Sequence, residues 1–553
     1  MLNHFSLLLF SVFLRKFQTM PNDCISYQES GYFTNIMMDY LNQKPELSAL
    51  YHRFPTLENF KLQIEEKGNS FNGNDKAKFK REVLVSALKN QYHSIEASPA
   101  TLNNIQLLHQ SNTFTITTGH QLNLFTGPLY FLYKIVSTIN LCKQLKSTYP
   151  EHNFVPIYWM ATEDHDFEEI NYFSLNGKKI SWNRNSSGPV GRLSTGGLDK
   201  VLEIFELEIG HGNNANYLKE LFKKTYVNHS NLADATRFLA NELFKNEGLV
   251  IIDADDKDLK KQMVPFIKKE LLEQTSFEHV TETIKKLRDY AVQVNPREIN
   301  LFYIEDHLRE RIIYENGTYS ILNTKLTFSK DELLKEVENH PEKFSPNVIL
   351  RPLYQEVILP NLCYIGGGGE LAYWLELKST FETNKVTFPI LLLRNSVLLA
   401  TEKQKQKATK LGLRWSDLFK NEQDLIHQQV QKTSQFTIDF TTQKEALKKQ
   451  FEDLHQIANQ TDPSFLGAVK AQEAKQMKGL ENLEKRLLKA EKRVHQDQLN
   501  RILTLQNELF PNQSLQERKV NFSEFYVAQG QELIEKLLKE LKPLENEFKV
   551  VVL

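Results

Sequence analysis

Two short stretches of the sequence place a histidine among groups that could do chemistry. In residues 117–128 (TTGHQLNLFTGP), His120 and Gln121 follow Gly119 at the end of an apolar, β-branched run. The triplet Thr126-Gly127-Pro128 then predicts the start of a helix, with Thr126 as a capping candidate. A strand-to-helix loop of this kind is where parallel sheets bind ligands, and a helix N-terminus favours phosphate. The alternative is that Gly119 serves only the turn and His120 is a capping or core residue.

The second stretch, residues 163–166, concentrates three carboxylates around His165 after the apolar run 154–160. Such a cluster could bind Mg²⁺, tune a histidine or orient an amine substrate. A helix N-terminus with acidic residues in its first turn is the alternative. His120 and His165 follow neighbouring predicted strands, so we expect both side chains to face one cleft, which helix capping does not explain. The candidates from this stretch are Glu163, Asp164, His165 and Asp166.

Arginines near two later apolar runs indicate an anionic ligand. Arg351 lies inside the run 348–353, which we predict to be a strand, between Asn347 and Gln355. A buried guanidinium needs an anionic partner, either a structural carboxylate or a substrate carboxylate, and we favour the substrate. Arg394, after the run 389–393, is likewise an arginine that we expect to have an anionic partner. A zinc hydrolase is disfavoured because the histidines lack HExxH spacing and no thiolates accompany them, so we expect no metal ligand set.

The elements that must position these residues are typical of a parallel α/β sheet. A strand–helix–strand pattern begins near residue 114, and strand patterns return at 248–253, 363–365 and 389–393. Four glycines, 366–369, precede Glu370 and predict a tight strand-to-helix turn, without the lysine of a P-loop. The pairs Asn176-Gly177 and Asn316-Gly317 predict hairpins within inserted segments near 172–245 and 300–325. With a helical lead-in, this core covers residues 20–420.

The last third of the chain predicts a helical hairpin at residues 421–510, followed by a segment, 511–553, that returns to the core. One heptad-like apolar stripe is formed by Leu447, Phe451, Leu454 and Ala458, and a second by Leu480, Leu483, Leu487, Ala490 and Val494. A turn at 461–464 separates the stripes. Because the flanking positions are charged, we expect a projecting coiled coil that serves self-association.

Composition limits the class of protein. The 553 residues carry a formal net charge of −1, which gives no overall attraction to nucleic acid, and 41% are hydrophobic. The three cysteines are far apart, which fits a reducing, cytoplasmic location. Residues 2–14 are apolar but too short to span a bilayer, so we expect no membrane association. Residues 1–19 are interpreted as a mis-assigned start or a disordered tail.

These motifs together resemble a known family. Residues 117–120 fit the [HT]-x-G-H signature of adenylate-forming Rossmann-like enzymes, which include class I aminoacyl-tRNA synthetases. With this signature, the chain from residue 20 to the end resembles the BshC family, the cysteine ligases of bacillithiol biosynthesis. The motifs that carry the resemblance are GHQ at 119–121, FTGPLY at 125–130, EDHDF at 163–167, SPN at 345–347, LRP at 350–352, GELAYW at 369–374 and LQER at 515–518.

The resemblance implies a Rossmann-like core with inserted segments, a coiled-coil domain and a homodimer. It implies a reaction that joins the cysteine carboxyl group to the amine of glucosaminyl malate, with ATP and Mg²⁺ as possible cofactors. The lysine-bearing second signature of the synthetases has no clear counterpart near Arg394. We expect catalytic roles for His120, Gln121, Asp164 and His165. We expect substrate contacts from Thr118, Gly119, Tyr130, Glu163, Asp166, Asn347, Arg351, Gln355, Glu370, Tyr373, Trp374 and Arg394.

Two rival functions remain open from the sequence. The first is a nucleotide-binding scaffold that acts through its coiled coil, and the second is a tRNA-dependent amino-acid transferase. Intact motifs at adjacent strand ends favour an enzyme over a scaffold. The neutral net charge disfavours tRNA as a partner.

Overall fold

A five-stranded parallel sheet positions the candidate site. The structure is a computed structural model that describes residues 24–72, 76–93 and 95–553, so the segment 1–19 lies outside the described residues. The sheet has the order β13-β12-β2-β3-β6. Its strands are β2 (Thr113–His120), β3 (Asn153–Met160), β6 (Val250–Asp253), β12 (Asn361–Gly366) and β13 (Ile390–Leu393). The chain runs outward from β2 to β6 and then crosses back to β12 beside β2. This reversal is a topological switch point, and the predicted Rossmann-like core is confirmed.

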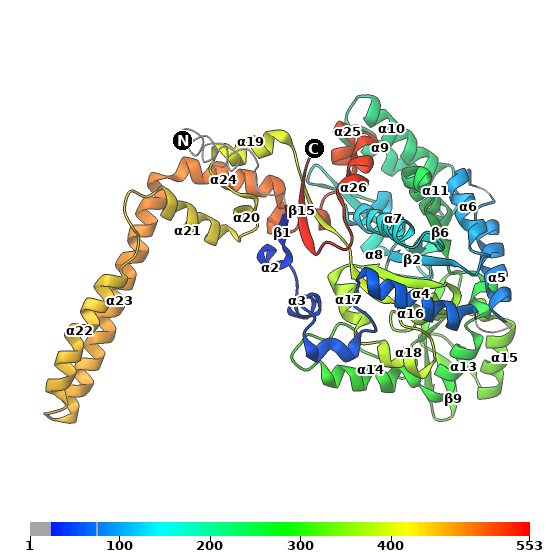
Figure 1. Ribbon diagram of the computed structural model, residues 1–553, viewed down its shortest axis with the longest axis horizontal. Helices are drawn as coiled ribbons and strands as arrows, with labels where there is room; N and C mark the ends of the chain where they lie inside the picture. The colour runs from blue at the N-terminus through cyan, green and yellow to red at the C-terminus, as the bar shows by residue number, and fades with distance from the viewer. Residues whose placement is uncertain (1–23, 73–75, 94) are drawn as a thin grey trace, which may run out of the picture.

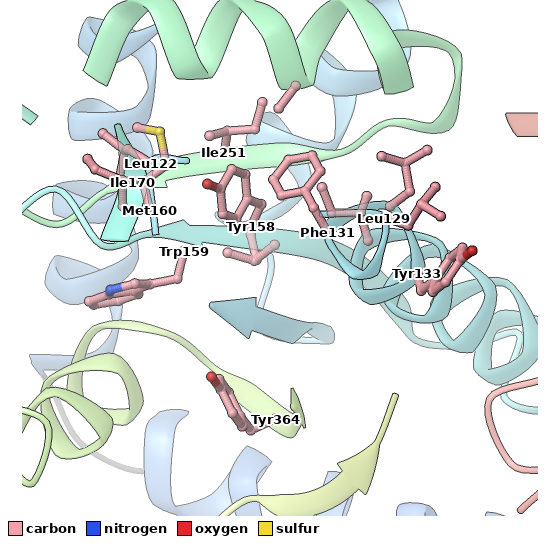
Figure 2. Packing of buried hydrophobic residues seen from close by; sticks show 14 of the residues in the cluster. Leu122, Leu129, Phe131, Tyr133, Tyr158, Trp159, Met160, Ile170, Ile251 and Tyr364 are labelled. Carbon is pink, nitrogen blue, oxygen red and sulfur yellow. The ribbon is translucent and has the colours of Figure 1, made fainter. Parts of the chain in front are cut away.

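Helix α7 (Tyr130–Thr148) connects β2 to β3 and packs against β2, β3 and β12. Most of its residues are buried and its N-terminus has no side-chain cap, so packing in the core holds the helix in place. Along β3, Tyr158 and Trp159 point to opposite sides of the sheet, as Figure 2 shows, and both are almost fully buried. The lead-in helices α4 (Leu57–Asn72), α5 (Lys76–Gln91) and α6 (Pro99–Leu107) contact β12 or β6. The sheet is therefore covered by helices, as a parallel sheet requires.

Two segments are inserted between strands of the sheet. The first contains the hairpin β4 (Tyr172–Leu175) and β5 (Lys178–Ser181), followed by α9 (Leu198–Ile209), α10 (Asn213–Phe222) and α11 (Leu232–Phe244). The second is an antiparallel sheet of order β10-β9-β8-β7-β11, in which β7 is Leu301–Glu305 and β10 is Thr327–Phe328. The sequence predicted only the hairpin of β8 (Leu308–Glu315) and β9 (Thr318–Ile321). Both Asn-Gly turns are confirmed, because Asn176 and Asn316 each have φ of 51°.

The prediction of a strand at residues 348–353 is wrong. The strand β11 (Phe344–Pro346) ends earlier, and α16 (Arg351–Ile358) begins at Arg351. The Asn347 side-chain oxygen accepts hydrogen bonds from the backbone N–H groups of Ile349 at 2.9 Å and Leu350 at 3.3 Å. Pro352 fits the first turn of a helix because no hydrogen bond is lost there. Arg351 therefore starts a helix instead of lying within a strand.

The coiled coil projects from the body of the protein, as Figure 1 shows. Helices α22 (Thr441–Ala458) and α23 (Pro463–Val494) confirm the predicted hairpin and pack through Phe451, Ala458 and Val469. The second predicted stripe is only partly correct. Leu487 packs near Val430 and Leu499, but 53% of Leu483 is exposed. The reason is that α23 is longer than α22, so that its later turns contact α21 (Glu422–Thr433) and α24 (Gln496–Leu509) instead.

Segments from both ends of the described chain form a small separate sheet. Strand β15 (Glu547–Val552) lies between β1 (Cys24–Ser26), to which it is antiparallel, and β14 (Ser396–Ala400), to which it is parallel. Helix α26 (Glu532–Glu540) packs on α7, and α25 (Ser523–Gln529) packs on α10. The C-terminal segment is thus in contact with the parallel-sheet core. Within the described ranges, no helix is both long and apolar enough to cross a membrane.

Candidate active site at the switch point

A cavity of about 510 Å³ opens at the carboxyl ends of β2, β3 and β12. Such a place, where strand order reverses, is the usual ligand site of an open α/β sheet. The structure brings together eleven residues that the sequence predicted for the site. They are Gly119, His120, Gln121, Tyr130, Glu163, Asp164, Asn347, Arg351, Glu370, Tyr373 and Arg394.

His120, the last residue of β2, presents a neutral imidazole to this cavity. Its ring lies 5.2 Å from the Tyr130 ring and 5.1 Å from the Phe131 ring, measured between centroids. Burial, followed by the charge of Lys134, lowers the pKa of His120 to about 3. The Nε2 atom is buried and has no hydrogen-bond partner among the described residues. A buried polar atom without a partner at a cavity wall is free to bind a ligand.

The loop after His120 is strained and is fixed from a distant part of the chain. Phe125 and Thr126 have φ of 47° and 70°, a region that residues with side chains rarely adopt. The Asn521 amide donates to the carbonyl oxygens of Phe125 at 2.8 Å and Gly127 at 2.6 Å. Thr126 lies before α7 and does not cap it, so the predicted capping role is wrong. The C-terminal segment holds the loop in a conformation that it would not adopt alone.

Arg351 reaches the cavity within an aromatic surround. Its guanidinium carbon lies 5.8 Å from the Trp159 ring, 5.5 Å from the Tyr364 ring and 5.9 Å from the Trp374 ring. Its Nη1 donates to Gln355 at 3.1 Å, whereas Nη2 is buried without a partner among the described residues. Aromatic faces stabilise a cation but do not satisfy its N–H groups. Nη2 is therefore a donor available to an anionic ligand.

Glycine at position 119 leaves space beside this arginine. A methyl group there would lie 3.1 Å from the Tyr364 hydroxyl and 3.9 Å from Arg351 Nη1. Any larger side chain would fill the cavity between the ends of β2 and β12. Glycine at position 119 therefore keeps space open in the cavity, in addition to serving the turn.

Lys134 and Glu370 join the two sides of the switch point. The Lys134 Nζ lies 2.5 Å from Glu370 Oε2 and donates to the Gly119 carbonyl oxygen at 2.7 Å. Burial lowers the pKa of Lys134, although the charge of Glu370 opposes that effect. Burial would raise the pKa of Glu370, but the charge of Lys134 and the Gly367 N–H lower it overall. The lowered pKa of Glu370 favours its ionised carboxylate beside the Lys134 Nζ.

The acidic stretch divides between two environments. Glu163 is buried, with Oε1 2.5 Å from Lys260 Nζ, and burial raises its pKa despite that partner. Asp164 accepts a hydrogen bond from Gln121 Nε2 at 3.0 Å. Burial alone would raise the pKa of Asp164, but hydrogen bonds from His165 and Gln121 lower it overall. Glu163 and Asp164 thus bring two carboxyl groups to the cavity, beside Arg309, whose Nη1 lies 3.9 Å from Asp164 Oδ1. Among the described residues, no group of three or more His, Cys, Asp or Glu could hold a metal ion.

Comparison with known proteins places the chain in a family. A family model described as Bacillithiol biosynthesis BshC, N-terminal Rossmann-like domain, matches residues 20–395, and one for its C-terminal coiled-coil domain matches residues 397–553. The chain belongs to the BshC family. Each of three BshC relatives bears the name "Putative cysteine ligase BshC". The one from Flavobacterium johnsoniae is 64% identical over 97% of this chain and 100% of its own length. Those from Flavobacterium psychrophilum and Christiangramia forsetii are 64% and 58% identical, each over 96% of this chain and 99% of their own lengths.

Five predicted site residues lie outside the cavity of this BshC chain. Thr118 is buried and donates to the Ile365 carbonyl oxygen at 2.7 Å, so it joins β2 to β12. Gln355 accepts a hydrogen bond from Arg351 Nη1, and Trp374 stacks on Tyr364 with 4.5 Å between ring centroids. The remaining two, His165 and Asp166, are exposed. The expectation that His120 and His165 face one cleft is therefore wrong: only Glu163 and Asp164 turn inward.

Three cationic residues of the BshC cavity were missed. Lys134 is a single lysine on the buried side of α7, and that position was a usable signal in the sequence. Arg309 comes from β8 of the second insertion, where its Nη1 lies 2.6 Å from His165 Nδ1. Arg518 comes from the LQER motif near the C-terminus. The last two reach the cavity only through long-range contacts, which local sequence patterns do not reveal.

Proposed function

We propose that this chain is a cysteine ligase that forms the amide between the carboxyl group of cysteine and the amine of glucosaminyl malate. The observation that carries this proposal is the family match over nearly the whole chain, together with a polar cavity at the switch point. Buried, unpartnered nitrogens of His120 and Arg351 at the cavity wall support a role in binding anionic groups.

The chemistry requires a leaving group on the cysteine carboxylate. The amine nitrogen attacks the carboxyl carbon, one carbon–oxygen bond breaks, and the amine gives up a proton. ATP, as a co-substrate with Mg²⁺, would convert the carboxylate into a mixed anhydride, an acyl phosphate with release of ADP or an acyl adenylate with release of pyrophosphate. The departing oxygen would then leave as part of phosphate or AMP. Lys134 and His120 are the residues that would face its phosphates. Since the described residues offer no metal cluster, Mg²⁺ would arrive bound to the nucleotide.

We place the two ends of glucosaminyl malate on opposite walls of the cavity. The free Nη2 of Arg351 suits a carboxylate of the malate half, because a guanidinium donates to carboxylate with matching geometry. Glu163 and Asp164 on the other wall suit the glucosamine nitrogen, which is an ammonium before reaction. Attack requires the neutral amine, so a nearby carboxylate would hold the group until it loses its proton.

We also propose that the coiled coil pairs with a second copy of the chain. On the hairpin, Leu454, Ile457 and Phe465 are 40%, 54% and 44% exposed. A projecting helical hairpin that keeps large apolar side chains in water favours self-association.

The test is product formation by the purified protein. Cysteine, glucosaminyl malate and ATP should yield a thiol whose mass equals cysteine plus glucosaminyl malate minus one water, measured by mass spectrometry. Serine in place of cysteine provides the matched substrate control. Absence of the thiol product with every nucleoside triphosphate tried would contradict the proposal.

A further inference from the structure

Two arginines line the cavity where the C-terminal segment contacts the core. Arg394 follows β13, and Arg518 belongs to the short 3-10 helix η8 (Gln516–Arg518). Both line the main cavity and also a smaller one of about 50 Å³ beside it, which Tyr32 and Phe33 of the lead-in help to close. The two cavities meet at these arginines.

Arg394 is 4% exposed, and protein groups satisfy only part of its guanidinium. Its Nη2 donates to Glu517 Oε1 at 2.7 Å, and Nη1 donates to the Asn395 carbonyl oxygen at 2.9 Å. Its Nε is buried and has no partner among the described residues. A methyl group on Gly367 would lie 3.8 Å from that Nε, at van der Waals contact distance. A buried guanidinium N–H without a partner, on a side chain that lines a cavity, is a candidate donor for a ligand oxygen.

Three of the cations here, Lys134, Arg394 and Arg518, carry one positive charge more than the carboxylates paired with them. Lys134 is paired with Glu370, and Arg394 is paired with Glu517. Arg518 is exposed at the rim and makes no ion pair within the described part of the chain. One singly charged anion would balance this arrangement.

The segment that carries Arg518 is firmly attached to the core. The Gln516 side chain makes two hydrogen bonds with the Leu399 backbone, at 2.9 Å and 3.0 Å. The second carboxylate oxygen of Glu517 accepts from the Val397 N–H at 3.1 Å. These contacts imitate strand pairing along β14 and place the neighbouring Arg518 at the cavity. Positioning of this kind is typical of a binding residue rather than of a solvated surface charge.

We infer that Arg394 and Arg518 form an anion subsite, completed by the C-terminal segment 515–518, that receives a carboxylate of the substrate. Arg394 Nε would donate to one oxygen, and Arg518 would neutralise the charge. Assignment of that carboxylate to the malate half rests on the proposed function, in which Arg351 binds the other one. A phosphate of the nucleotide has the same chemistry, and the experiment separates the two sources.

The test compares Arg518→Gln with Lys519→Gln, a change at the next residue, which is exposed and lies outside the cavity. Calorimetric titration would use glucosaminyl malate, glucosaminyl lactate, which lacks the second carboxylate, and ATP as separate ligands. Arg518→Gln should weaken binding of glucosaminyl malate about tenfold and leave glucosaminyl lactate unchanged, since one charge-assisted contact is lost. Lys519→Gln should change neither. Arg394→Lys retains the charge that faces Glu517 but removes Nε, and it should weaken the same ligand.

The other outcomes are also decisive. If Arg518→Gln weakens ATP binding alone, the subsite stands and its anion is a phosphate. Equal affinities of wild type and Arg518→Gln for every ligand, or a wild type that binds none of them, would overturn the subsite. A wild type that binds glucosaminyl malate through Arg518 but makes no thiol product would keep the subsite and contradict the proposed reaction.

Discussion

Lys134 on α7 and Glu370 on α17 (Gly368–Trp374) form an ion pair across the topological switch point, with 2.5 Å between Nζ and Oε2. The lysine side chain is 4% exposed and the glutamate 28%. Lys134 also binds the Gly119 carbonyl oxygen, so one ammonium connects the ends of β2 and β12. The spacing between the two walls of the cavity depends on this pair.

The first prediction concerns the stability of that connection. Lys134→Met should lower the free energy of unfolding by about 3 kcal/mol, because it leaves the mostly buried Glu370 carboxylate without its cationic partner. The double variant Lys134→Met, Glu370→Leu should recover most of the loss. Lys143→Met is the matched control on the same helix, since Lys143 pairs with Glu247 at the surface. Urea unfolding measures all of these variants. A loss in Lys134→Met no larger than in Lys143→Met would contradict the assigned role.

The second prediction concerns acid stability. His120 has a pKa of about 3 in the folded protein, against 6.5 as its ordinary value. Between these values the unfolded chain binds a proton that the folded chain does not, so stability falls as pH falls below 6.5. From pH 7 to pH 5, wild type should lose about 2 kcal/mol more than His120→Gln, which lacks the titrating group. Chemical unfolding at both pH values tests this difference, and parallel losses in the two proteins would refute it.

The third prediction concerns activation of cysteine. If the leaving group is an adenylate, the protein should catalyse cysteine-dependent exchange of pyrophosphate into ATP, with AMP as the nucleotide product. A phosphate beside His120 would raise the pKa of the imidazole and allow both nitrogens to donate. His120→Ala should then reduce exchange by roughly 10² to 10³. Arg351→Ala should impair the glucosaminyl malate step more than the exchange. Formation of ADP and phosphate would exclude the adenylate route.

The fourth prediction concerns the coiled coil. Leu454→Lys with Ile457→Lys should convert a dimer into a monomer in light scattering, because two exposed apolar side chains of α22 become charged. Glu452→Lys with Gln456→Lys alters the opposite side of the same helix and should leave the dimer intact. Leu487 is unsuitable for this test because it packs within its own chain. A monomeric wild type would show that the hairpin serves another purpose.

Much of the fold was predictable because its signals are local. Asn176 and Asn316 indicate their hairpins because asparagine tolerates the positive φ that these turns require. The apolar runs indicate the strands of the parallel sheet. The failure at residues 348–353 has an equally local cause. An apolar run of that length fits a strand or a buried helix, and Asn347 with Pro352 was the signal that favours the helix.

The site was less predictable because it is assembled from distant segments. His120 ends β2, and Glu163 and Glu370 follow the ends of β3 and β12, so the sheet topology brings the three residues together. Arg309 and Arg518 come from an insertion and from the C-terminal segment, and no spacing in the sequence relates them to β2. The prediction for His165 was wrong although this residue is next to Asp164 in the sequence. Neighbouring side chains in a loop can point in different directions, and His165 is exposed.

The position of β15 has a consequence for synthesis of the chain. Residues 547–552 complete the small sheet between β1 and β14, and Asn521 fixes the strained loop after His120. Ribosomes make both segments after the loop and the strands that they contact. During synthesis the parallel sheet and the loop after His120 therefore lack these contacts, which join residues far apart in the sequence. A chain shortened before Arg518 would keep the strands of the parallel sheet but lose both the hydrogen bonds that hold this loop and one arginine of the cavity wall.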